Sequence, residues 1–196
     1  MRTFLTVLAG TFYIVGYVPY IGGILRGISK PSKASWLIWA TLDVITVVEM
    51  SAKGVLNGQI IGVALGSWIV TILAFMHGSN EWKKLDIWCL AGAIAGIVLW
   101  KVIGDATIGI IISSIIMFIG CIPTFASAWN HPEHENRSAW TLYFVSCILQ
   151  LCAIETWTTA TAAQPVSFAI SEAVMMILLW IKPKRATKTV HAKTTP

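Results

Sequence analysis

Long apolar blocks separated by short polar segments dominate the chain. A membrane-spanning helix needs about 20 largely apolar residues, and seven blocks meet or approach this length, at about residues 3–25, 35–50, 58–77, 86–103, 106–129, 138–155 and 163–181. The run that follows Arg2 exceeds the apolar part of a signal peptide, so we expect it to be retained as the first helix. The pattern predicts an all-α membrane protein with seven transmembrane helices.

The composition also favours lipid over water as the surroundings of these helices. Only 12% of the 196 residues are charged and 56% are hydrophobic, whereas soluble domains carry about 25% charged residues. The four cysteines lie inside apolar blocks, at a spacing that suits neither a metal site nor a disulfide framework. No nucleophile–base pair or Gly-rich phosphate loop is present. We therefore expect a bilayer protein, as a monomer or homo-oligomer, with no enzyme activity, cofactor or nucleic-acid partner.

The basic residues predict the orientation. Eleven of the 14 Lys and Arg residues lie in the loops after the first, third and fifth spans and in the C-terminal tail. The other side holds Arg2, Lys53 and Lys101. Because basic loops stay in the cytoplasm, we expect the cytoplasmic membrane of the cell, with the N-terminus outside and the C-terminus inside. The basic tail, 183–196, is expected to be disordered.

An internal repeat divides the chain. Shifting the sequence by 104 positions aligns glycines, prolines, tryptophans and serines, in the pairs Gly16 and Gly120, Pro19 and Pro123, Trp36 and Trp140, Ser67 and Ser171. We expect a three-helix repeat at 1–78, a linker helix at 79–105 and a second repeat at 106–182. The single linker helix gives both repeats the same direction in the membrane, and a site is expected between them.

Each repeat has a proline late in its first helix, followed by a short polar loop and a helix that opens with tryptophan. The segments are Val18-Pro19-Tyr20 before Ser35-Trp36, and Ile122-Pro123-Thr124 before Ala139-Trp140. This arrangement resembles the PQ-loop and SWEET superfamily, although Tyr20 and Thr124 replace the glutamine of a strict PQ pair. The plan is also similar to that of nicotinamide riboside transporters. The resemblance implies a small-metabolite carrier, most commonly for sugars or vitamins.

The second and sixth spans each place aromatic and polar residues on one helical face, namely Trp36, Trp39, Asp43 and Thr46, and Trp140, Tyr143, Cys147 and Gln150. Such a face suits a cavity in which rings stack on a solute and polar groups orient it. We expect Trp39 and Asp43 in this cavity. Trp36 and Trp140 open their helices, and for them we expect an interfacial belt.

Two acids lie near the middle of their spans, Asp43 and Glu172. A charged carboxylate there costs roughly 2.5–3.5 kcal/mol, which makes both candidates for binding substrate or a proton. The alternative is a protonated acid hydrogen-bonded to a neighbouring helix. Trp68 is expected opposite Glu172, and Ser67 and Ser171 are further candidates for binding or for helix packing. Neighbours on a helix point about 100° apart, so Ser171 and Glu172 are not both expected to face the cavity centre.

Gly16 with Pro19, and Gly120 with Pro123, are hinge or gate candidates, because proline removes a helical hydrogen bond; static kinks are the alternative. The segment His131–Glu135 resembles a metal motif but is expected to be a solvated loop without metal. The polar segment Thr156–Ala163 is expected to be an outer loop.

The favoured function is a carrier that moves a small metabolite by alternating access, by facilitation or with proton coupling. The alternative is a receptor or sorting protein of the same fold that binds without transporting.

Overall fold

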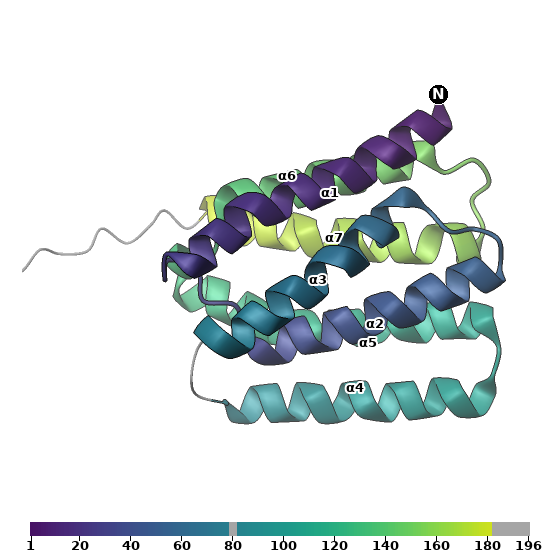
Figure 1. Cartoon of the computed structure of the whole chain (residues 1–196). Helices are drawn as coiled ribbons and strands as arrows, with labels where there is room; N and C mark the ends of the chain where they lie inside the picture. Colours follow the sequence, from purple (N-terminus) through teal and green to yellow (C-terminus); the bar gives the residue numbers. More distant parts are fainter. Residues whose placement is uncertain (79–81, 182–196) are drawn as a thin grey trace, which may run out of the picture.

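The computed structural model describes residues 1–78 and 82–181 (Figure 1). Within these ranges the chain forms helices and no strand. They are α1 (Arg2–Leu25), α2 (Lys33–Ala52), α3 (Gly58–His77), α4 (Lys84–Ile103), α5 (Ala106–Asn130), the short 3₁₀ helix η1 (Pro132–His134), α6 (Arg137–Ala153) and α7 (Thr159–Ile181). The predicted all-α class is confirmed, and the predicted disordered tail lies outside the described residues.

Local sequence signals set the helix ends. Asn57 and Asn136 each cap a helix, and their side-chain oxygens accept from the backbone N–H of Ile60 and Ala139 at 2.9 and 3.0 Å. Gly27 and Gly54 follow α1 and α2 with φ of +70° and +67°. Only glycine adopts this left-handed conformation readily, so the chain turns at these two points.

Helix packing follows a pattern that is unchanged when α1, α2 and α3 exchange places with α5, α6 and α7. Helix α3 packs against both α1 and α2, and α7 packs against both α5 and α6. Between the two groups, α1 lies along α6 and α2 lies along α5. Helix α4 lies at the outer edge of the bundle, against α5 and α2 (Figure 1).

Six of the helices are long and apolar enough to cross a membrane: α1, α2, α3, α4, α5 and α7. Helix α6, with 17 residues, is not among them. Large apolar side chains also cover the outside of the bundle, including Val18, Leu65, Trp88 and Ile181, which are 64–75% exposed. Soluble monomers rarely expose contiguous apolar surface of this kind, so the helices suggest a multi-pass membrane protein.

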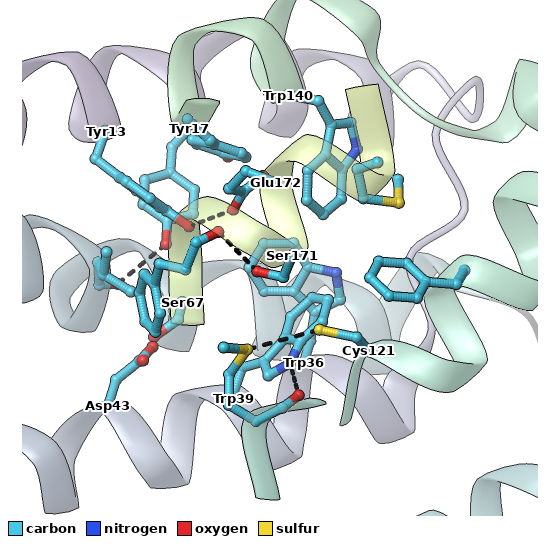
Figure 2. A pocket seen from close by; sticks show the side chains of 16 residues that line it. Tyr13, Tyr17, Trp36, Trp39, Asp43, Ser67, Cys121, Trp140, Ser171 and Glu172 are labelled. Carbon is cyan, nitrogen blue, oxygen red and sulfur yellow. Dashed lines mark hydrogen bonds between the residues drawn. The ribbon is translucent and has the colours of Figure 1, made fainter. Parts of the chain in front are cut away.

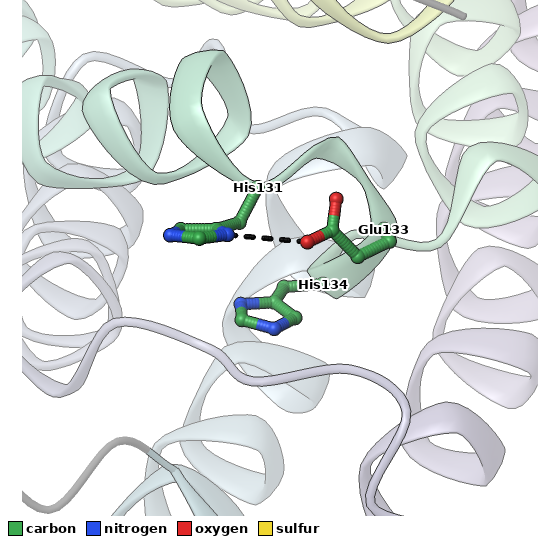
Figure 3. A group of neighbouring side chains, drawn as sticks. All are labelled: His131, Glu133 and His134. Atoms are coloured by element: carbon green, nitrogen blue, oxygen red, sulfur yellow. Dashed lines mark hydrogen bonds and ion pairs between the residues drawn. The ribbon is translucent and has the colours of Figure 1, made fainter. Parts of the chain in front are cut away.

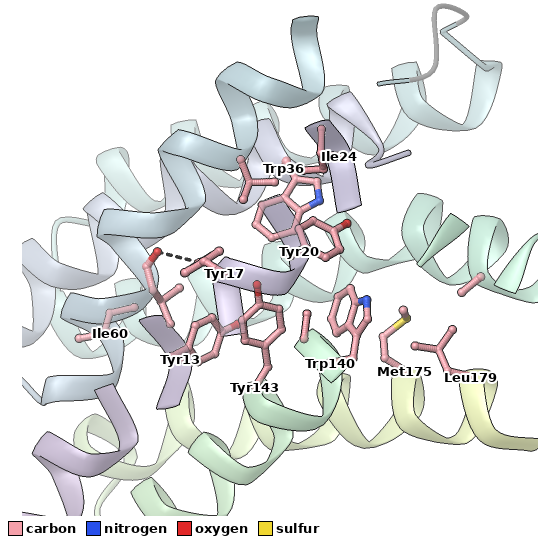
Figure 4. Packing of buried hydrophobic residues seen from close by; sticks show 14 of the residues in the cluster. Tyr13, Tyr17, Tyr20, Ile24, Trp36, Ile60, Trp140, Tyr143, Met175 and Leu179 are labelled. Atoms are coloured by element: carbon pink, nitrogen blue, oxygen red, sulfur yellow. Dashed lines mark hydrogen bonds between the residues drawn. The ribbon is translucent and has the colours of Figure 1, made fainter. Parts of the chain in front are cut away.

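An aromatic core joins α1, α2 and α6 (Figure 4). The Tyr13 ring stacks on Tyr143 with centroids 4.4 Å apart, and Tyr20 packs against Trp36 at 5.2 Å. Aromatic pairs at these distances contribute more than their buried area alone. This core positions the side chains that border the cavity described below.

Two loop predictions are wrong in part. Helix α7 begins at Thr159. Of the expected loop Thr156–Ala163, only residues 156–158 therefore lie outside the helix. In the segment His131–Glu135, expected to be solvated, Pro132 is buried and Glu135 is only 6% exposed. The side chain of Glu135 contacts α1 and α6. The local sequence does not indicate that these two helices come together here.

Candidate functional site

A cavity lies where the two groups of helices meet (Figure 2). Half of its lining residues are aromatic. The lining is formed by Tyr13, Tyr17, Trp36, Trp39, Asp43, Val63, Ser67, Met117, Cys121, Phe125, Trp140, Tyr143, Phe168, Ser171, Glu172 and Met175. The space between these side chains is about 500 Å³ including the cavity mouth, but only about 40 Å³ admits the centres of water-sized spheres. That room suits a few water molecules, so this is a constricted conformation.

Ten of the sixteen lining residues form pairs that are 104 positions apart. Five pairs border the same cavity: Tyr13 and Met117, Tyr17 and Cys121, Trp36 and Trp140, Trp39 and Tyr143, Ser67 and Ser171. Positions that match in the sequence therefore border the same space, although the two halves carry different chemistry. Asp43 lines the cavity but Cys147, its counterpart, does not.

Two glycine–aromatic contacts repeat this relation. A Cβ atom on Gly16 would lie 2.7 Å from Cδ1 of Tyr143, and one on Gly120 would lie 2.9 Å from Nε1 of Trp39. The two glycines are 104 positions apart, as are the two aromatic residues. Each glycine thus lets a cavity-lining ring of the other helix group rest on the backbone of its own helix. Both prolines, Pro19 and Pro123, lie inside continuous helices, and their hinge role remains a prediction.

The cavity contains two carboxylates, and neither is fully satisfied. Glu172 is 4% exposed; its Oε1 accepts from the Tyr13 hydroxyl at 3.1 Å, and its buried Oε2 has no hydrogen-bond partner. Asp43 is 3% exposed, and its buried Oδ2 also has none. Two further buried polar atoms on the lining lack partners, Trp36 Nε1 and the Tyr143 hydroxyl. Buried polar groups are nearly always hydrogen-bonded, so four such atoms around one cavity indicate a place for water or a ligand.

Most other polar groups of the lining are already engaged. The Ser171 hydroxyl donates to the Phe168 carbonyl at 2.9 Å. Trp39 Nε1 donates to the carbonyl of Met117 at 3.2 Å, and the Tyr17 hydroxyl donates to that of Val63 at 3.0 Å. These bonds hold the side chains in place, so these donors are not free to bind a molecule in the cavity.

Several predictions about the site are corrected. Trp36 and Trp140 are each 4% exposed and border the cavity, so they do not form an interfacial belt. Ser171 and Glu172 both line the cavity, on the helix α7 that packs against α5 and α6. Trp68 is 40% exposed and lies outside the cavity, so it does not face Glu172.

Two predicted residues lie at a polar network beyond the cavity: Gln150 is part of it and Cys147 contacts it. We call this network the amide end, and it consists of Thr6, Asn57, Gln59, Gln150 and Gln164. The Thr6 hydroxyl donates to Oε1 of Gln150 at 2.7 Å. Asn57 donates to Oε1 of Gln164 at 3.1 Å, and Gln164 donates to Oε1 of Gln59 at 3.4 Å. The network joins α1, α3, α6 and α7 at the end of the bundle that contains the N-terminus (Figure 1).

Gln59 is the centre of that network. Its side chain is fully buried, and Nε2 lies 3.2 Å from the Ser146 hydroxyl and 3.3 Å from the Cys147 sulfur. Ser146 in turn donates to the Ala9 carbonyl at 2.7 Å. Cys147 therefore faces the network, while its predicted role in binding is not supported by contact with the cavity.

The opposite end is built around one acid that sequence reasoning missed. Oε2 of Glu135 accepts from Trp140 Nε1 at 2.9 Å and from the Tyr20 hydroxyl at 3.2 Å. The neighbouring Asn136 donates from Nδ2 to the Pro19 carbonyl at 2.8 Å. Burial raises the pKa of the Glu135 carboxyl to about 7, although the two donated bonds act in the other direction. We call these five residues the carboxylate end.

Tyr13 and Tyr17 are also lining residues that sequence reasoning missed. They lie four positions apart on α1, with Tyr20 three positions further, which places all three on one face. Their counterparts Met117 and Cys121 were inconspicuous in the apolar fifth span. The regular tyrosine spacing was the available signal.

A second group of ionisable side chains lies on the surface, at the start of the α5–α6 connection (Figure 3). Ligand-type atoms of His131, Glu133 and His134 all lie within 4.8 Å of one another. Nδ1 of His131 lies 3.1 Å from Oε1 of Glu133, and the two imidazole rings stack with their planes 19° apart. The group thus offers three ligand-type atoms close together, and the expectation of a loop without metal stays a prediction.

Comparison of the chain with family models, with curated proteins and with solved structures gives no match.

Proposed function

We propose that this protein is a multi-pass membrane carrier that moves a small metabolite through the cavity by alternating access. The observation that carries the proposal is the position of the cavity. It lies between two helix groups whose packing is unchanged by exchange, and five pairs of repeat-related residues line it. Carriers built from parallel repeats bind their substrate at such an interface.

The seven helices are proposed to cross the membrane as two three-helix repeats joined by α4, as in the PQ-loop and SWEET superfamily that the sequence resembles. Helix α6 is then a short span whose ends reach the interface. The excess of Lys and Arg in the loops at the carboxylate end favours a cytoplasmic position for that end. The amide end, with the N-terminus, then faces outward.

The constricted cavity fits a carrier in a closed conformation, intermediate between its two open states. Hydrogen bonds join α1 to the α5–α6 connection at the carboxylate end, and α3 to α7 at the amide end. A metabolite enters only if one of these ends opens, and alternating access requires that they open in turn. Asp43 and Glu172 are the groups proposed to contact the metabolite or a coupled proton, because both line the cavity and each has a buried oxygen without a hydrogen-bond partner.

Uptake into proteoliposomes tests the proposal. The panel comprises sugars, nucleosides, vitamins, amino acids and organic amines, with and without a pH gradient. Asp43→Asn and Glu172→Gln are compared with wild type and with Glu49→Gln. Glu49 is a matched control because it is buried on the same helix as Asp43, accepts from the Ser113 hydroxyl at 3.3 Å and lies outside the cavity.

We expect saturable uptake of at least one solute, reduced at least tenfold by Asp43→Asn or Glu172→Gln and retained by Glu49→Gln. If all three variants retain uptake, the two cavity acids are not needed for transport. Saturable binding without transport of any panel member would favour the receptor.

A further inference from the structure

The cavity has a pronounced bias in its chemistry. Eight of the sixteen lining residues are aromatic, and the charged side chains among the described lining residues are Asp43 and Glu172, both acidic. No Lys, Arg or His is among these lining residues. Two carboxylates surrounded by aromatic rings are a poor environment for an anion and a costly one for themselves, unless a positive charge lies between them.

The free hydrogen-bonding groups point the same way. A neutral sugar presents many hydroxyl groups, each of which needs both a donor and an acceptor when it is buried. Here the hydroxyls of Tyr17 and Ser171 and the N–H of Trp39 already donate to backbone carbonyls. The unpartnered groups of the lining are two carboxylate oxygens, which only accept while they are ionised, together with the Trp36 N–H and the Tyr143 hydroxyl. These four groups are few for the many hydroxyls of a polyol, and the charged ones are both acidic, so the cavity suits a cation better than a polyol.

The aromatic rings supply the remaining part of such a site. The faces of tyrosine and tryptophan rings attract ammonium groups, and aromatic cages recognise quaternary ammonium ligands in this way. Tyr13 and Tyr143 stack at 4.4 Å, and the Tyr13 hydroxyl donates to Glu172. Trp36 and Trp39 meet edge to face at 5.2 Å and belong to the same helix, α2, as Asp43. All six residues line the one cavity, so both acids share it with two pairs of aromatic rings.

We propose that the carrier is selective for small monovalent organic cations, with an ammonium group between Asp43 and Glu172 and its alkyl groups against the aromatic rings. This inference rests on the proposed function, whose substrate class it names. It favours an amine or a quaternary ammonium compound over the sugars that the sequence resemblance implied.

The test compares cations with neutral molecules of the same shape. Equilibrium binding to the purified full-length protein in nanodiscs is measured for choline against 3,3-dimethylbutan-1-ol, and for phenyltrimethylammonium against tert-butylbenzene. We expect at least one cation to bind about tenfold or more tightly than its neutral counterpart. Glu172→Gln and Asp43→Asn should each remove most of this preference. Glu49→Gln, which changes a buried acid outside the cavity, should leave it within about twofold of wild type.

The inference is overturned if neither cation binds more tightly than its neutral counterpart, or if both cavity variants keep the full preference while remaining folded. Folding of each variant is checked by its thermal unfolding midpoint in the same nanodiscs. The uptake assay distinguishes the two failures. Transport of a neutral panel member without any preference for cations would support the proposed carrier function and contradict the proposed selectivity for cations. A preference for cations without transport would support a cation-binding site and contradict the carrier function.

Discussion

At the amide end of the cavity, neutral side chains hold α3 and α7 together, whereas at the carboxylate end one buried acid accepts from α1 and α6. Both ends share one device. Asn57 and Asn136 each cap a helix with the side-chain oxygen and use the side-chain nitrogen to reach another helix. The difference is that only Glu135 changes charge near neutral pH. The amide end and the carboxylate end are built alike, and their stability can therefore depend differently on pH.

The largest expected effect is at the centre of the amide end. Gln59→Ala removes the bonds to Ser146, Cys147 and Gln164 and leaves a cavity, which should cost about 4 kcal/mol of stability. The thermal unfolding midpoint in detergent measures this, at two pH values. Thr11→Ala is the control, because Thr11 is exposed and bonds only within its own helix. The loss should be the same at pH 5 and pH 8, and a loss confined to one pH would remove the contrast between the ends.

The next effect belongs to Glu135 and depends on pH. Because the folded protein raises the pKa of this carboxyl from 4.5 to about 7, the folded state holds a proton that the unfolded state has already released. Stability should therefore be highest below pH 4.5 and fall as pH rises to about 7, by up to about 3 kcal/mol. Glu135→Gln keeps an acceptor for Tyr20 and Trp140 but cannot ionise. Its unfolding midpoint should exceed that of wild type at pH 8 and match it near pH 4.5.

The contribution of Glu135 is read from the difference between variant and wild type, since Asp43, Glu49 and Glu172 remain in both. A difference that does not change between pH 4.5 and pH 8 would show that Glu135 does not titrate in this range. The carboxylate end would then be as insensitive to protons as the amide end.

The smallest expected effects compare the two capping asparagines. Asn57→Asp and Asn136→Asp keep a good cap for α3 and α6 but lose the donor to Gln164 and to the Pro19 carbonyl. Each should cost about 1 kcal/mol. Asn57→Ser and Asn136→Ser also keep a cap and add no charge, so they separate loss of the bond from the new carboxylate. If serine and aspartate variants are both as stable as wild type, the bonds between helices do not hold the ends closed.

The sequence predicted the helices well, because the length of each apolar block marks a helix within a few residues. It also located Asp43 and Glu172. An acid in the middle of an apolar helix is costly to bury, so its position is informative whichever way the helix is rotated. The rotation of α3 was harder to predict, and Trp68 was wrongly placed as a result. A stripe of Gly58, Gly62 and Gly66 packs this helix against α1, and Trp68, two positions beyond Gly66, points about 200° around the helix from that glycine.

Glu135 was missed for a different reason. It lies in a polar segment next to two histidines and a second glutamate, which is typical of a solvated loop. Its burial depends on Tyr20 and Trp140, 115 and five positions away along the chain. Contacts of this kind follow from how helices converge in three dimensions, and hydropathy does not report them.

The central claim is that the cavity opens to each side of the membrane in turn, and the native Cys121 on its wall can report this directly. In a variant with Cys89→Ala, Cys147→Ser and Cys152→Ser, a membrane-impermeant thiol reagent is added to oriented vesicles from one side or the other. A carrier predicts modification of Cys121 from both sides, slowed in each case by a transported solute. Modification from one side only, in protein that is folded and binds its ligand, would contradict alternating access.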